Sequence, residues 1–160
     1  GALPFILEDL GHITPDVVEL RDALGLPGMN VVARVADIDW RTDSVLYTST
    51  HDSETLAQWW QRWGREHQPQ LAAGRKAGES EHRAVLQNVL AVENELVVIP
   101  AQDLLGLGAE GRMNRPGTVN GDNWKWRLER PLTLEQAHLL REWTEDAGRQ
   151  ALSGVSSSSR

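Results

Sequence analysis

The 160-residue chain contains no cysteine, which excludes disulfide bonds and a zinc site built on thiolates. No apolar run is long enough to cross a bilayer, and no signal peptide is visible. The net charge of -7 argues against a nucleic-acid or anionic membrane partner. His67, His82 and His138 lack the spacing of metal ligands. We therefore expect no metal, no cofactor, no nucleic acid and no membrane, and a cytoplasmic location fits.

Aromatic residues other than tryptophan are scarce, with one Phe and one Tyr against seven Trp. Trp59, Trp60 and Trp63 recur at helical spacing, which favours a place in the core over a platform for sugars. Trp124 and Trp126 alternate around a lysine, as in a short extended edge. Packing is the favoured interpretation there as well, with stacking against glucose as the alternative.

The apolar pattern predicts an α/β fold with four short strands that alternate with helices. Expected strands cover residues 4–7, 29–35, 44–50 and 96–99. They are apolar throughout rather than alternating, which is typical of parallel sheets covered on both faces. Four such units make half of an eight-stranded α/β barrel, or a small open sheet. We expect one barrel-like domain over residues 1–150 and a disordered polar tail over 151–160.

Helix starts are marked by capping residues. Thr14 precedes Pro15 at the start of the first helix, and Asp52 or Ser53 can cap the tryptophan-rich helix. Thr133 opens the last helix as a capping box.

Two carboxylates each follow an expected strand, Glu8 after the first and Asp52 after the third. Parallel α/β units carry their chemistry on loops after the carboxyl ends of the strands. The pair therefore predicts an active site at that edge. The structural alternatives are a surface charge for Glu8 and a helix cap for Asp52.

Several stretches carry a family signature in the right order. They are residues 8–15 (EDLGHITP), 25–29 (GLPGM), 47–52 (YTSTHD), 100–118 and 123–127 (NWKWR). Together they closely resemble the C-terminal part of the 4-alpha-glucanotransferases, the amylomaltases or disproportionating enzymes of glycoside hydrolase family 77. The resemblance implies that the chain forms strands five to eight of a TIM-type barrel.

The resemblance also implies transfer of α-1,4-glucan segments between maltooligosaccharides by a retaining mechanism. Glu8 would be the general acid/base after strand five. Asp52, after strand seven, would stabilise the transition state. His51 and Asn114 would contact the sugar, with a buried histidine and a turn asparagine as the structural alternatives.

The family's nucleophile is an Asp on the N-terminal side of the general acid, yet the seven residues before Glu8 include no acid. We expect the isolated chain to be inactive. Ser53 stands where the family often has Asn, and the short stretch 37–43 replaces a longer segment that contacts the acceptor. The expected partners are α-1,4-glucans and either an N-terminal barrel half or a second copy. The alternatives are a non-catalytic, self-associating half-barrel and a related alpha-amylase-type hydrolase.

Overall fold

The computed structural model describes residues 4–34, 41–119 and 121–149. The chain divides into two compact units, residues 1–127 and 128–160, and each is described by itself. Three expectations lie wholly or partly outside the described residues: the end of the second strand, most of the stretch 37–43, and the tail 151–160.

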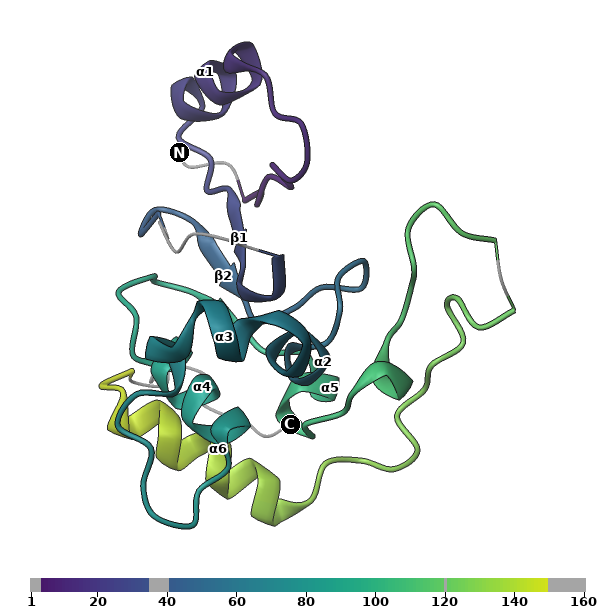
Figure 1. Cartoon of the computed structure of the whole chain (residues 1–160). Helices are drawn as coiled ribbons and strands as arrows, with labels where there is room; N and C mark the ends of the chain where they lie inside the picture. Colours follow the sequence, from purple (N-terminus) through teal and green to yellow (C-terminus); the bar gives the residue numbers. More distant parts are fainter. Residues whose placement is uncertain (1–3, 35–40, 120, 150–160) are drawn as a thin grey trace, which may run out of the picture. The chain divides into compact units, whose positions relative to one another are not determined.

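A small parallel sheet lies in the first unit, with strands β1 (Met29–Val31), β2 (Val45–Tyr47) and β3 (Val97–Val98). Their order is β1-β2-β3, and Figure 1 shows β1 beside β2. In the register, Met29 lies opposite Val45 and Leu46 opposite Val97. The α/β class and three of the four expected strands are confirmed, with shorter bounds than the apolar runs predicted.

The strand expected over residues 4–7 is wrong, because this segment is irregular. One backbone hydrogen bond, from the Leu7 N–H to the Pro27 carbonyl at 2.9 Å, ties it to the chain before β1. Phe5 and Ile6 are 62% and 45% exposed. A strand needs a ladder of backbone partners along its length, and a single bond does not supply one.

Helices follow the predicted order. The first unit has α1 (Pro15–Ala23), α2 (Leu56–Trp59), the π-turn η2 (Trp60–Gly64), α3 (Arg65–His67), α4 (Glu81–Leu90) and α5 (Ala101–Leu104). Three short 3₁₀ segments are η1 (Val32–Arg34), η3 (Pro69–Ala72) and η4 (Ala109–Gly111). The second unit has α6 (Leu134–Asp146). None of the described helices is long and apolar enough to span a membrane.

The core of the first unit joins β2 to α2 and α4. Leu46, Leu56 and Leu86 are each 0% exposed. Trp59 and Trp60 are also buried, so the core interpretation of these two tryptophans is confirmed. This packing anchors the chain on both sides of the turn between β2 and α2.

The observed caps differ in two places from those predicted. Thr14 stands at the N-cap of α1, but its side chain makes no capping hydrogen bond. The Thr55 hydroxyl accepts the Gln58 N–H at the start of α2, so neither Asp52 nor Ser53 is the cap. Thr133 and Gln136 form the predicted capping box of α6. The shift to Thr55 matters because it leaves the Asp52 carboxylate free of the helix end.

Candidate active site

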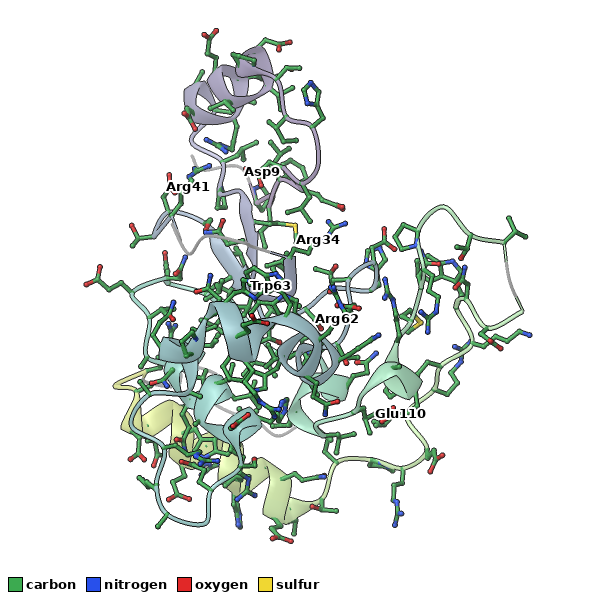
Figure 2. All side chains as sticks on the ribbon, viewed as in Figure 1. Asp9, Arg34, Arg41, Arg62, Trp63 and Glu110 are labelled. Carbon is green, nitrogen blue, oxygen red and sulfur yellow. The ribbon has the colours of Figure 1, made fainter. Side chains whose placement is uncertain are left out.

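Glu8 lies in an exposed loop that its neighbour Asp9 fastens to the sheet. One Asp9 carboxylate oxygen accepts the Met29 N–H at 2.7 Å, at the first residue of β1. The other oxygen lies 2.6 Å from Arg21 Nη1 and 3.6 Å from Arg41 Nη1 (Figure 2). Asp9 therefore holds the loop, and Glu8 is left free to face solvent.

The ion pair between Asp9 and Arg21 of α1 is almost fully buried. The Asp9 and Arg21 side chains are 7% and 6% exposed. Two hydrogen bonds raise the pKa of the Arg21 guanidinium above its ordinary value. The bond to Asp22 has the larger effect and the bond to Asp9 the smaller one. Gly28 lies so close to the Asp9 carboxylate that a Cβ at this position would overlap it. Gly28 is thus required by the space that the Asp9 carboxylate occupies, and not by its own backbone conformation.

The turn after β2 brings three of the four predicted site residues together. The Asn114 Nδ2 donates to Asp52 Oδ1 at 2.7 Å. His51 Nε2 lies 3.5 Å from the same oxygen. The Asp52 side chain is 33% exposed and that of His51 is 52% exposed, so both are open to a ligand.

The buried carboxylate of Asp103 holds this turn in place. One Asp103 oxygen accepts the Thr48 hydroxyl at 2.5 Å, and the other accepts the Leu56 N–H at 2.8 Å. These partners stand just before and just after the segment that carries His51 and Asp52. Asp103 is 0% exposed, so the bonds are sheltered from competing water.

Burial raises the pKa of Asp103 above its ordinary value. Hydrogen bonds from Ser49, Thr48 and the Leu56 N–H act in the opposite direction but do not outweigh the burial. The folded protein therefore holds this proton to a higher pH than the unfolded chain does.

A cavity of about 390 Å³ lies at the carboxyl ends of the strands. Its lining includes Glu8 and His51, together with Tyr47, Met29 and Pro100. The structure thus brings Glu8 to the same cavity as the His51–Asp52 turn, although these residues are more than 40 positions apart in the sequence.

Asp52 does not line this cavity but lines a second one, of about 590 Å³. Arg34, Arg62 and Trp63 line it and lie close together in Figure 2. Arg62 is neutralised by Glu54, whose carboxylate it meets at 2.8 Å. Asp52 therefore faces a space rich in hydrogen-bond donors.

The chemistry available is that of carboxylates, an imidazole and an amide around open space. Such groups bind hydroxyl-rich ligands and move protons. In the described ranges, no group of three His, Cys, Asp or Glu residues is arranged to hold a metal ion.

Sequence reasoning missed one residue of this region, Asp103, and favoured packing over exposure for another, Trp124. Asp103 belongs to the motif 100–118, but it follows Gln102 and precedes Leu104, and this local pattern does not indicate a buried carboxylate. Trp124 was expected to pack, but it is 54% exposed. Its ring centroid lies 5.4 Å from that of His51.

Comparisons with known proteins agree with the resemblance. The family model for 4-alpha-glucanotransferases (glycoside hydrolase family 77) matches residues 1–133. The 4-alpha-glucanotransferase of Synechocystis is 37% identical over 78% of this chain, and that of Thermus thermophilus is 37% identical over 80%. The chloroplastic/amyloplastic enzyme of Arabidopsis thaliana is 38% identical over 80% of the chain.

The chain spans only about a quarter of the length of these relatives, from 24% to 29%. A solved amylomaltase of Streptococcus agalactiae, in complex with acarbose, has a TM-score of 0.81 and 30% identity. That match covers 93% of this chain and 32% of the other. The chain belongs to the 4-alpha-glucanotransferase family.

Proposed function

We propose that this chain supplies the acid/base half of a 4-alpha-glucanotransferase site, which transfers α-1,4-glucan segments between maltooligosaccharides. Glu8 is the general acid/base, and Asp52 stabilises the oxocarbenium-like transition state. His51 and Asn114 hydrogen-bond the sugar hydroxyls. The observation that carries this proposal is the cluster of Asp52, His51 and Asn114 beside a cavity that Glu8 also lines.

The geometry supports separate roles for the two acids. Glu8 is exposed and lines the cavity, so a ligand bound there can come within hydrogen-bond reach of its carboxyl group. Asp52 is held by an amide donor and lies near an imidazole. A carboxylate positioned by such donors can face a positive charge that develops on the sugar.

We further propose that the parallel strands belong to the C-terminal half of a TIM-type barrel, in a domain over residues 1–150. The high TM-score to an amylomaltase over 32% of its chain supports this placement. A retaining mechanism needs a second carboxyl about 5–5.5 Å from the acid/base. That nucleophile is supplied by an N-terminal barrel half outside these 160 residues, so the chain alone is inactive.

The test is a disproportionation assay with maltotriose. The chain is incubated alone and with a separately expressed N-terminal half, and the products are separated by size. We expect glucose and longer maltooligosaccharides only with both halves, and none when Glu8→Gln replaces the wild type. Transfer by the chain alone, or transfer that survives Glu8→Gln, would contradict the proposal. Glucose without longer products would indicate a hydrolase instead.

A second candidate is a self-associating half-barrel without catalysis. Four apolar side chains in the N-terminal segment are at least 45% exposed: Phe5, Ile6, Leu20 and Leu24. Exposed apolar surface of this kind favours association. Sedimentation distinguishes the two, because a monomer that binds an N-terminal half excludes stable pairing of copies. Cytoplasmic location stays part of the proposal, and fractionation of the source cells tests it.

A further inference from the structure

Trp124 has a backbone conformation that tryptophan rarely adopts. Its φ is +65°, and it is the one residue other than glycine with a positive φ among the described residues. The left-handed region costs a bulky side chain of order 1 kcal/mol or more. A cost of this kind persists only where the surroundings impose it.

Two hydrogen bonds impose the conformation. The Trp124 N–H donates to the Met113 carbonyl at 2.8 Å. Arg127 Nη1 donates to the Trp124 carbonyl at 3.0 Å and to the Trp126 carbonyl at 2.7 Å. Both polar groups of the Trp124 backbone are thereby held.

The ring is held where it can meet a ligand. It is 54% exposed, which is unusual for the largest apolar side chain. It lies at a tilt of 36° to the ring of His51, at a centroid distance of 5.4 Å. Met113, which holds the Trp124 backbone, is followed directly by Asn114, which holds Asp52. One short loop thus positions both the tryptophan and the carboxylate.

We infer that Trp124 is a stacking platform for a glucose ring of the bound α-1,4-glucan, next to His51. This inference rests on the proposed function. A pyranose presents C–H groups on its face and hydroxyls at its edge. The indole takes the apolar face out of water, while His51 and Asp52 remain at the edge to meet the hydroxyls. The strained backbone is retained because it aims the indole at the sugar.

The inference predicts that stability and binding change in opposite directions. Trp124→Gly removes the ring and also relieves the strained φ, because glycine adopts φ > 0 freely. We expect the melting temperature to stay equal or rise, while the dissociation constant for maltoheptaose rises about tenfold or more. Trp124→Phe keeps an apolar ring and should retain most of the affinity. A ring that merely packs would lose stability together with any binding.

The experiment titrates the 160-residue chain with maltoheptaose and follows tryptophan fluorescence and the NMR signals of the His51 ring. Val119→Ala, at a fully exposed apolar residue of the same segment, is the matched control and should bind like the wild type. Equal binding by Trp124→Gly and wild type overturns the inference, as does a wild-type chain that does not bind maltoheptaose. Neither result decides the proposed function, which the transfer assay with Glu8→Gln tests through chemistry instead.

Discussion

The two proposed acids are held by regions of opposite character. Glu8 belongs to residues 4–28, where α1 buries a single side chain, that of Arg21. Asp52 belongs to the turn between β2 and α2, which stands over Leu46, Leu56 and Leu86, all 0% exposed. The first region is held together by the Asp9–Arg21 ion pair and tied to β1 by the bond from the Met29 N–H to Asp9. The second region is held by a buried core and the Asp103 carboxylate.

This contrast indicates a division of stability within the site. Regions with little buried apolar area open locally at low free-energy cost, while core elements open only with the whole fold. The Asp52 turn should therefore keep its geometry up to global unfolding. The geometry of the Glu8 loop should instead depend on the polar contacts of Asp9 and on the backbone bond from Leu7 to Pro27.

The largest loss of folding stability is expected for Asp103→Ala. It leaves the Thr48 hydroxyl and the Leu56 N–H without their acceptor in a buried site. We expect the free energy of unfolding to fall by about 3 kcal/mol, measured by urea denaturation. Asp103→Asn keeps one acceptor oxygen and should cost clearly less. Equal losses for the two variants would contradict this expectation, because they would mean that one amide oxygen cannot replace the two acceptor oxygens of the carboxylate.

The next effect is a local loss of stability in the Glu8 loop, which the contacts of Asp9 with Arg21 and the Met29 N–H hold in place. Arg21→Met removes the main partner of the buried Asp9 carboxylate, which keeps the Met29 N–H and Arg41 nearby. We expect a cost of about 2 kcal/mol. We expect amide exchange at Met29, which donates to Asp9, to accelerate strongly, with little change in exchange at Leu46.

The matched control for Arg21→Met is Asp22→Ala. Asp22 contacts the same guanidinium but its side chain is 58% exposed. An exposed ion pair contributes less than about 1 kcal/mol, so Met29 exchange should hardly change. If amide exchange at Met29 accelerated equally in both variants, the loop would be protected from exchange by α1 and not by the Asp9 contact.

The same contrast explains what could be predicted from the sequence. In the core region, the apolar runs predicted β2 and β3, and helical spacing predicted the burial of Trp59 and Trp60. In the N-terminal region, the apolar run over residues 4–7 predicted a strand that did not form. Apolar content indicates which segments suit a strand, but backbone pairing decides whether one exists. The hydrogen bonds to Asp103 come from residues more than 40 positions away in the sequence, so no local pattern predicts them. The positive φ of Trp124 is a property of the backbone, which the residue types around it do not indicate.

A smaller effect concerns pH. Burial raises the pKa of Asp103, so the folded state binds more protons than the unfolded state between the two pKa values. The stabilisation is therefore complete below the ordinary value of 3.8 and is lost as the pH rises through the raised pKa. The wild type should lose stability relative to Asp103→Asn over that interval, by at most about 1.4 kcal/mol per pH unit. Parallel profiles from denaturation at several pH values would contradict this.

The smallest effect is expected for Asn114→Ala, which removes the amide donor to Asp52. Because the Asp52 side chain is 33% exposed, water replaces the lost bond, and global stability should change by less than about 1 kcal/mol. The change should instead be visible at the turn, as a shift of the His51 ring signals in NMR spectra, since both side chains contact Asp52 Oδ1. Signals of His67, which stacks on Trp63 in the helix, serve as the internal control and should not move. An unchanged His51 signal would mean that Asp103 and the core alone position the turn, with Asn114 left to bind the sugar.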